Sequence, residues 1–429
     1  MDIFVEKFGG ASVNSADAVR NVEKILLSET KNRIVVISAM GKTTNKLENI
    51  VNTWFNEHRF HTEQYRELTE YHQDIINSLF SSDKTAINCL KAVENLFKSM
   101  EQRVMNYSGK DYNYLYDSIV STGEKVSTTI VSAYLNYRGL SNCLIDASKV
   151  IITDNNFRDA NIDWQSTQAR VIKLKDMFSP SCRLLITQGF IGGTLSGDTT
   201  TLGREGSDFS AAILAHCLNA KTMTVWKDVP GLMNADPKRV PDTVHILSVP
   251  YTEAVELSYY GAGIIHPKTI KPLENVSVPL YIKSFVDPTA QGTVICSSGS
   301  VCPIVPNYIF KDNQILMSVS PKDLSFATES SISKIFSVLA KHKVKVNLMQ
   351  NSAISFSVCF DENKSILPLL TDDLSKDFNV LYNTNLQLIT IRHYTLNAIE
   401  ETIRGRRILI EQKSRTTAQY LVSNSDPKD

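Results

Sequence analysis

The sequence lacks the features that mark membrane, secreted and nucleic-acid-binding proteins. Its longest apolar runs, such as Ile34 to Ile37, are too short to cross a bilayer, and the chain does not open on a basic stretch followed by an apolar segment. The 45 basic and 45 acidic residues form no long run of one sign, which disfavours a nucleic-acid partner. We therefore expect a cytoplasmic protein with no membrane or nucleic-acid partner.

Disulfide and metal-ligand patterns are also lacking. The seven cysteines form no CxxC pair, and such an odd, scattered set indicates buried thiols. His58, His61 and His72 lie among glutamates without the spacing of metal ligands, which indicates polar surface residues. We expect no metal held by protein side chains.

The pattern that is present predicts an α/β fold followed by smaller modules. A chain of 429 residues and 48.0 kDa exceeds what one core normally organises, so two or three domains are expected. Within residues 1–297, β-branched runs alternate with helix-like segments, which predicts a mostly parallel sheet with ligands beyond its carboxyl edge. Residues 52–116 read as a helical insertion, and the small residues and prolines of 298–308 as a linker.

Two small α+β modules are predicted at residues 309–378 and 379–429. The order strand, helix, strand, strand begins twice in this part of the chain. A helix and the strand NVLYNT follow the first of these runs, and the second run begins with a separate strand, LQLITIRHY. No helix pattern follows Val422, and the last residues, SNSDPKD, are typical of a frayed tail. The sheet of the second module is then incomplete unless a partner subunit or the first module completes it.

The first strand runs into the segment KFGGAS, which contains Lys7, Gly9 and Gly10. Glycines permit the backbone conformations and close approach of a phosphate-cradling turn, and a lysine supplies a point charge. The segment is neither GxGxxG nor GxxxxGK followed by Ser or Thr, and an ordinary turn remains an alternative.

The segment TTTLGREGSDFSAA predicts a site for an amino acid. The fork of Arg204 suits a carboxylate and Asp208 suits an ammonium group. The alternative is a helix that Ser207 or Asp208 simply caps.

Three further segments contain candidate site residues. SAMGKTTN offers hydroxyls and main-chain amides, or is only a polar connection. Glu124 in STGEKVS is an ammonium ligand, or an acidic first-turn residue that responds to the helix dipole. WKDVPGLMNADPKRV could border a nucleotide, although Pro and Gly alone predict only turns. His266 is expected to cap or pack.

Several of these segments together resemble the aspartate kinase family. KFGGASV, SAMGKTTN, GFIGG with TTTLGREGSD, WKDVPGLMNADP and SFVDPTAQGTVI occur in the family's order and with compatible spacing. The resemblance implies the amino acid kinase fold, a three-layer α/β/α arrangement around a mostly parallel sheet. It also implies ATP-dependent phosphorylation of the β-carboxylate of L-aspartate to 4-phospho-L-aspartate, the first step of lysine, threonine and methionine biosynthesis.

The resemblance implies roles for the candidate residues, with Lys7 and Asp208 as the catalytic pair. ATP is the implied co-substrate, with Mg²⁺ bound through its phosphates. The residues implied to bind substrate are Ser38, Thr44, Glu124, Arg204, Ser207 and Asp208. Those implied to bind the nucleotide are Lys7, Gly9, Gly10, Lys227, Asp228, Met233, Asp236 and Lys238.

Two positions depart from the family pattern. Gly263 stands where the family often has a second lysine, whose phosphate contact Lys268 or Lys238 could supply. Glu205 stands where the family usually reads GRGGSD, and we expect its side chain to face solvent.

The two C-terminal modules resemble ACT domains, which in this family bind an end-product amino acid and dimerise. The effector residues implied by the match are Lys345, Val346, Asn347 and Ser352. Asn347 stands where lysine-sensitive members usually carry aspartate, so the effector is lysine or threonine, and a homodimer is expected. The alternatives are a glutamate or acetylglutamate kinase, or a catalytically silent amino-acid sensor.

Overall fold

The computed structural model describes residues 1–28, 31–81, 84–263, 265–298, 300–323 and 325–423. Within these residues the chain forms two compact units. The first contains residues 1–232, 245–255 and 263–303, and the second contains 233–244, 256–262 and 304–429. The expected frayed tail, SNSDPKD, begins at Ser423, which instead ends the last strand of the chain, and its other residues, 424–429, lie outside the described part of the chain.

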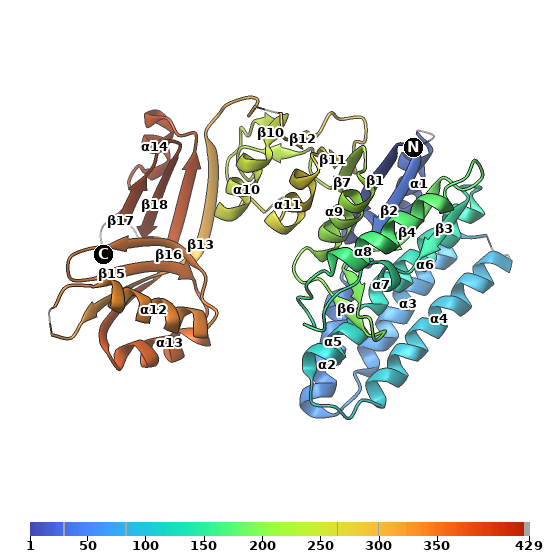
Figure 1. Cartoon of the computed structure of the whole chain (residues 1–429), viewed down its shortest axis with the longest axis horizontal. Helices are drawn as coiled ribbons and strands as arrows, with labels where there is room; N and C mark the ends of the chain where they lie inside the picture. Colours follow the sequence, from blue (N-terminus) through green and yellow to red (C-terminus); the bar gives the residue numbers. More distant parts are fainter. Residues whose placement is uncertain (29–30, 82–83, 264, 299, 324, 424–429) are drawn as a thin grey trace. The chain divides into compact units, whose positions relative to one another are not determined.

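The first unit is built on a mostly parallel sheet, which confirms the predicted α/β fold (Figure 1). Its order is β10-β12-β11-β7-β1-β2-β4-β3, and the β11–β12 pair is antiparallel. The central strands are buried on both faces, which explains their near-continuous apolar sequences. The strands are β1 (Ile3–Phe8), β2 (Asn32–Ile37), β3 (Asn142–Ile145), β4 (Leu184–Gln188), β7 (Thr222–Lys227), β10 (Ser248–Pro250), β11 (Leu280–Ser284) and β12 (Thr293–Cys296).

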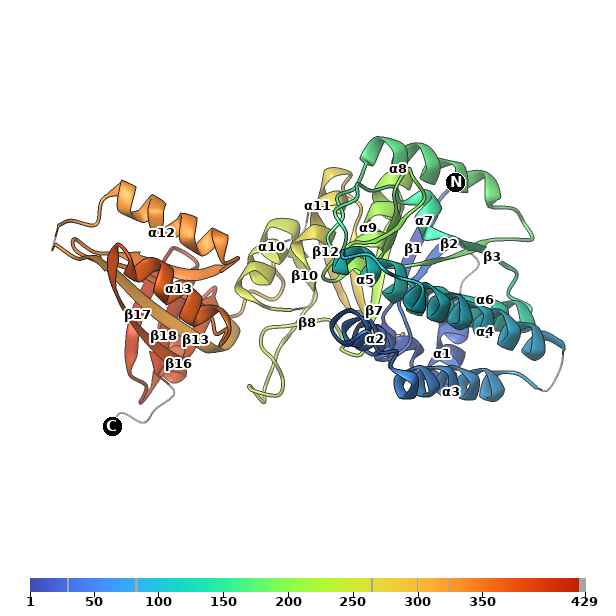
Figure 2. The same cartoon turned by 90° about the horizontal axis from the view of Figure 1, so that it is seen from below.

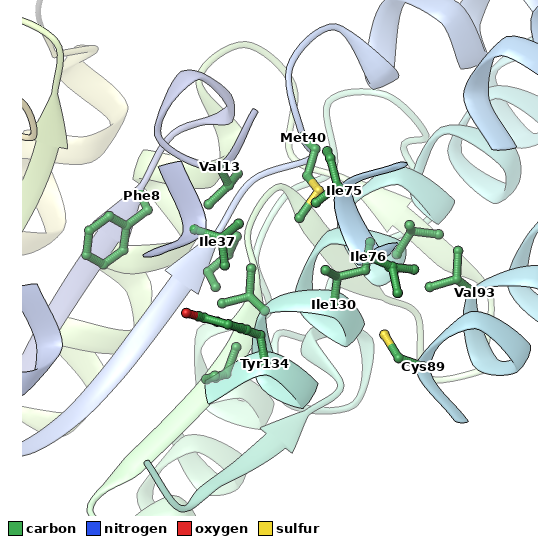
Figure 3. Packing of buried hydrophobic residues seen from close by; sticks show 14 of the residues in the cluster. Phe8, Val13, Ile37, Met40, Ile75, Ile76, Cys89, Val93, Ile130 and Tyr134 are labelled. Atoms are coloured by element: carbon green, nitrogen blue, oxygen red, sulfur yellow. The ribbon is translucent and has the colours of Figure 1, made fainter. Parts of the chain in front are cut away.

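Helices cover both faces of this sheet. One core cluster joins β1, β2 and β4 to the helices α1 to α6, and Figure 3 shows side chains of α3, α4 and α6 meeting there. Helix α9 packs on β1, β2 and β7 and takes no part in that cluster. The helices before β13 are α1 (Ala16–Leu27), α2 (Thr43–Glu57), α3 (Thr62–Leu79), α4 (Lys84–Met105), α5 (Tyr112–Val120), α6 (Thr122–Tyr137), α7 (Ala147–Val150), α8 (Trp164–Val171), α9 (Gly206–Leu218), α10 (Tyr251–Tyr260) and α11 (Pro267–Asn275), with 3-10 turns η1 (Gly10–Val13) and η2 (Ile172–Met177).

The helical insertion is longer than the predicted 52–116. It begins with α2 at Thr43 and ends with α5 at Val120, and α3, α4 and α6 run side by side (Figure 2). Two further pairs of short strands lie outside the main sheet. They consist of β5 (Ile191–Gly193) with β6 (Thr199–Thr201), and β8 (Leu232–Met233) with β9 (His245–Ile246).

The interpretation of all three insertion histidines as surface residues is wrong for His72. Its ring is fully buried, where Nδ1 lies 2.7 Å from the Leu68 carbonyl, and burial lowers its pKa to about 4. The seven cysteines are free thiols, but only Cys89, Cys217 and Cys359 are buried. None of the helices in the described ranges has the length and apolar character needed to cross a membrane.

The second unit contains one six-stranded sheet that both C-terminal modules share. Its order is β14-β15-β13-β16-β18-β17. Helices α12 and α13 pack on one half of the sheet, and α14 packs on the other. The elements are β13 (Asn307–Pro321), α12 (Glu329–Lys341), β14 (Val346–Asn351), β15 (Phe356–Asp361), α13 (Ile366–Ser375), β16 (Phe378–Arg392), α14 (Leu396–Ile403), β17 (Ile408–Lys413) and β18 (Thr417–Ser423).

The long strands β13 and β16 each run through both halves of this sheet. The segments NVLYNT and LQLITIR, expected as separate strands, form the single strand β16. The first part of β13 pairs with the last part of β16, and the register shifts between Lys311 and Gln314 before the remaining parts pair. The first module therefore supplies the strand that completes the sheet of the second.

Candidate active site

Strands β1, β2, β4 and β7 are parallel neighbours, so their carboxyl ends meet at one edge of the sheet. Lys7 is the penultimate residue of β1, and Lys227 is the last residue of β7. The segment that follows β2 lies against the one that follows β1, because Gly41 N–H donates to the Gly10 carbonyl over 3.1 Å. The segments that follow β1 and β2 and the end of β7 therefore converge at this edge.

Asp208 joins two lysines at the centre of the site. Lys7 Nζ lies 2.6 Å from Asp208 Oδ1, and Lys227 Nζ lies 3.8 Å from Oδ2. The side chains of Lys7 and Asp208 are only 11% and 4% exposed, so each charge depends on its partner for compensation. Asp208 lies in the first turn of α9, where the helix dipole also favours a negative charge.

The alternative interpretation, in which Ser207 or Asp208 only caps α9, is wrong. The residue at the cap is Glu205, and its side chain makes no capping hydrogen bond. A tight turn precedes the helix, in which Gly206 N–H donates to the Gly203 carbonyl over 3.0 Å. This turn places Ser207 and Asp208 inside the first helical turn, and both side chains line the pocket instead.

A pocket of about 340 Å³ surrounds the Lys7–Asp208 pair. The predicted site residues that line it are Lys7, Gly10, Ser38, Thr44, Glu124, Ser207, Asp208 and Lys227. The lining residues that the sequence interpretation did not single out as ligands are Ala39, Gly41, Phe190, Gly203, Glu205 and Gly206. Most of these are neighbours of predicted residues in the same loops, so the loop could be recognised from sequence although the individual contact could not.

Glu124 carries a buried carboxyl group at the start of α6. The residue is 3% exposed, and Oε1 accepts a long hydrogen bond of 3.4 Å from Ala39 N–H. Its Oε2 atom has no hydrogen-bond partner within the described residues. Burial raises the pKa of Glu124 to about 8. An ammonium group in the pocket would satisfy the free oxygen and stabilise the carboxylate.

Arg204 and Glu205 lie differently from expectation. The Glu205 side chain lines the pocket and its Oε2 atom is buried, so the expectation that it faces solvent is wrong. Arg204 is exposed and lies outside the set of pocket-lining residues, as does Gly9. Both differences arise from the turn before α9, in which Glu205 has a left-handed backbone with φ of 54°. This backbone conformation was not apparent from the sequence.

Asp117 fixes the loop before α9 and was missed by the sequence interpretation. Its carboxyl group accepts hydrogen bonds from Thr201 N–H over 2.8 Å and Thr201 Oγ1 over 2.6 Å, and from Arg158 N–H over 2.9 Å. Burial raises its pKa to about 6. No sequence signal distinguishes this aspartate inside an apolar helix, because its partners are distant in the chain.

The predicted nucleotide residues are divided between the two units. Asp228 is exposed at the end of β7 in the first unit, whereas Met233, Asp236 and Lys238 belong to the second. In that segment Asp236 Oδ1 accepts a hydrogen bond of 2.9 Å from Lys238 N–H. Across the described chain, no group of three His, Cys, Asp or Glu side chains is placed to hold a metal ion.

Lys268 does not line the pocket. Its ammonium pairs with Asp159 Oδ1 at 2.5 Å, and Gly263 is exposed. His266 caps α11, where Nδ1 accepts a hydrogen bond of 3.2 Å from Lys268 N–H, as expected of a capping residue.

The predicted effector residues run from Lys345, just before β14, to Ser352, just after it. Lys345 Nζ lies 5.2 Å from the centre of the Tyr259 ring. Asn347 Oδ1 accepts a hydrogen bond of 2.9 Å from Lys311, and its Nδ2 donates to Gln314 and Asp361. The residues of this set are Lys345 and Ser352, which are exposed, and Val346 and Asn347, which are half-buried.

The sequence of the chain is similar to one family of known proteins. A profile described as the amino acid kinase family matches residues 2–284. The chain is 30% identical over 389 residues to the lysine-sensitive aspartokinase 3 of Escherichia coli, covering 90% of this chain and 85% of that protein. It is 31% identical over 369 residues to the chloroplastic aspartokinase 3 of Arabidopsis thaliana, covering 84% of this chain and 65% of that protein.

Solved structures show the same fold. The E. coli aspartokinase III complex with lysine and aspartate superposes with a TM-score of 0.82 at 27% identity, covering 99% of this chain and 96% of that one. The aspartate kinase of Clostridium acetobutylicum superposes with a TM-score of 0.77 at 23% identity, covering 98% and 96% of the two chains.

Proposed function

Because the chain belongs to the amino acid kinase family and, within it, to the aspartokinases, we propose that it transfers the γ-phosphoryl group of ATP to the β-carboxylate of L-aspartate. The products are 4-phospho-L-aspartate and ADP. The observation that carries this proposal is the buried Lys7–Asp208–Lys227 arrangement in a pocket that also contains the free carboxyl oxygen of Glu124.

The chemistry requires alignment and charge compensation more than covalent help. The attacking carboxylate has an ordinary pKa of about 3.9 and is ionised at neutral pH, so no general base is needed. Negative charge spreads over the transferred phosphoryl group, and cations fixed in a partly dry pocket stabilise it. Lys7 supplies such a cation, and Asp208 holds its ammonium in place.

We assign the ammonium and α-carboxylate groups of aspartate to other side chains in and beside the pocket. Glu124 has an acceptor for the substrate ammonium, and Ser38, Thr44 and Ser207 provide hydroxyls. Arg204 remains the proposed partner of the α-carboxylate, because a guanidinium fork matches that group and both sequence neighbours of Arg204 line the pocket.

The nucleotide is proposed to enter from the ends of β1 and β7. Mg²⁺ would be bound through the phosphates of ATP, as is usual for this ion, and would neutralise developing charge there. The proposed contacts in the first unit are Lys7, Gly9, Gly10, Lys227 and Asp228. Met233, Asp236 and Lys238 belong to the second unit, and their contact with the nucleotide stays a prediction from the family resemblance.

A coupled ADP-release assay tests this function. ADP release with ATP should require aspartate, and glutamate or acetylglutamate should not replace it. Release with glutamate instead would assign the chain to another amino acid kinase. Absence of release with every amino acid would leave only the silent sensor.

We further propose feedback inhibition of this first biosynthetic step by lysine, with the C-terminal modules mediating a homodimer. Supporting this, the similar E. coli protein is named lysine-sensitive and has a structure with lysine bound. The proposed effector residues are Lys345, Val346, Asn347 and Ser352. Activity curves for the parent, Lys345→Ala and Asn347→Ala should respond differently to lysine. If only threonine lowers the activity, threonine and not lysine is the effector. If neither amino acid changes any of the curves, the proposed feedback inhibition is contradicted.

A further inference from the structure

The turn before α9 places a third carboxyl group in the amino-acid pocket. Glu205 has φ of 54°, in the left-handed region that non-glycine residues occupy uncommonly. Its carbonyl accepts hydrogen bonds from Asp208 N–H over 3.0 Å and Phe209 N–H over 3.2 Å, so the first turn of α9 fixes this backbone. The turn therefore sets the direction in which the Cα–Cβ bond of Glu205 leaves the backbone.

That direction is into the pocket. Glu205 lines the pocket with Glu124 and Asp208. Its Oε2 atom is buried, and no group in the described part of the chain donates to it. A buried carboxylate oxygen without a donor is unfavourable, which makes it a receptor for a donor that arrives with a ligand.

The two lysines of the pocket do not satisfy this oxygen. Lys7 and Lys227 both lie against Asp208, at 2.6 Å and 3.8 Å. Two carboxyl oxygens, Glu124 Oε2 and Glu205 Oε2, are left without donors. A ligand that brings a hydrogen-bond donor would satisfy these oxygens, and an ammonium group would also compensate their charge.

We propose that Glu205 is a specificity-determining residue that accepts a hydrogen bond from the substrate ammonium, together with Glu124. This inference rests on the proposed function and deepens it. A dicarboxylate that lacks the ammonium would leave both buried oxygens unpaired and would bring further negative charge to them. The pocket would then reject such an acid far more strongly than one glutamate alone could achieve.

The opposite role predicts a different pattern. If Glu205 only repelled the carboxylates of the substrate, its removal would strengthen binding of every dicarboxylate alike. Aspartate and succinate separate the two roles, because both have two carboxylates on four carbons and only aspartate has an ammonium.

The test compares Glu205→Gln with the parent. The amide keeps the size of the side chain and removes its charge. We expect the KM for aspartate to rise about 10- to 100-fold with kcat changed by less than about threefold, since the lost contact is a charged hydrogen bond. The inhibition constant of succinate should stay the same or fall. Equal changes for the two acids, or a lower KM for aspartate, would overturn the proposal.

Two further variants secure the comparison. Glu205→Gly removes the side chain where glycine is comfortable, so it should fold and show the same loss of preference for the ammonium. Glu63→Gln, an exposed glutamate in the first turn of α3, should change neither constant.

Calorimetric binding of aspartate and succinate separates this proposal from the proposed function. A parent that binds aspartate with a preference dependent on Glu205 but releases no ADP would contradict the kinase function alone. A parent that turns over aspartate while Glu205→Gln keeps the preference would contradict the role of Glu205 alone. A parent that neither binds nor turns over aspartate would contradict both.

Discussion

At the scale of single residues, Lys7 and Asp208 form a buried ion pair, for which we propose a catalytic role in addition to its structural one. Lys7→Met should lower kcat by about 10²- to 10³-fold, because a fixed cation is lost from the phosphoryl group. It should also lower the free energy of unfolding by about 3 kcal/mol, because Asp208 stays buried without its close partner. Steady-state kinetics and urea unfolding measure the two effects.

The double variant Lys7→Met with Asp208→Asn separates these parts. It removes the uncompensated charge, so stability should return while turnover does not. Lys98→Ala, whose side chain is 65% exposed in α4, is the control and should change neither quantity. Recovery of turnover in the double variant would argue against a catalytic Lys7.

The buried carboxyl group of Glu124 predicts a dependence of stability on pH. Burial raises its pKa from the ordinary 4.5 to about 8 in the folded protein. Between these values the folded chain retains a proton that the unfolded chain has released, so the free energy of unfolding falls as pH rises. Glu124→Gln removes this decrease in the free energy of unfolding. The melting temperature of the variant should therefore rise relative to that of the parent between about pH 6 and about pH 8. A difference that is constant across this range would contradict the raised pKa.

The sequence predicts which residues lie at the strand ends and helix starts of the site, but not the directions in which their side chains point. Lys7, Glu124 and Asp208 follow or adjoin recognisable strands and helix starts, and the parallel sheet brings them to one edge. Glu205 could not be placed, because its direction depends on a left-handed residue in a turn between distant contacts.

At the scale of elements, the two glycines of KFGGAS have different steric surroundings. A Cβ atom on Gly10 would lie 2.7 Å from the Ala39 carbonyl oxygen, which belongs to the segment after β2. A Cβ atom on Gly9 would meet nothing closer than Lys7 Nζ at 3.5 Å, and its φ of −76° suits any residue. Close approach of two loops, and not unusual backbone angles, explains the glycine at position 10.

These contacts predict unequal effects of alanine at the two positions. Gly10→Ala should lower the free energy of unfolding by about 1–3 kcal/mol and raise the KM for ATP, because the two loops must separate. Gly9→Ala should stay within about 0.5 kcal/mol of the parent. Urea unfolding and initial rates check both, and equal effects would contradict the assigned roles.

Most elements could be predicted because their own sequence periodicity determines them. Strand β2, for example, is one of the β-branched runs, and helix α4 lies in the predicted helical insertion. The union of NVLYNT and LQLITIR into β16 could not be predicted, because pairing with β13 holds the strand together across the register shift.

At the scale of the whole molecule, the two units can be monitored separately. All three tryptophans, at positions 54, 164 and 226, belong to the first unit. Their fluorescence therefore reports on that unit, whereas circular dichroism reports on both.

A core substitution in the second unit uses this difference. Leu421 is fully buried in a cluster with Leu348, Leu388 and Ile410, to which no helix in the described residues contributes. Leu421→Ala should cost about 2–5 kcal/mol and lower the dichroism midpoint more than the tryptophan midpoint. Ile408→Ala, at a more exposed position of the same sheet, is the matched control. An equal shift of both midpoints would mean that the units unfold as one.

The shared strands β13 and β16 also constrain how this protein could be rebuilt. Because each strand carries hydrogen bonds for both halves of the sheet, cutting the chain between the halves would leave open edges on both sides. An engineer who wants to graft or exchange the C-terminal modules must therefore transfer both strands together.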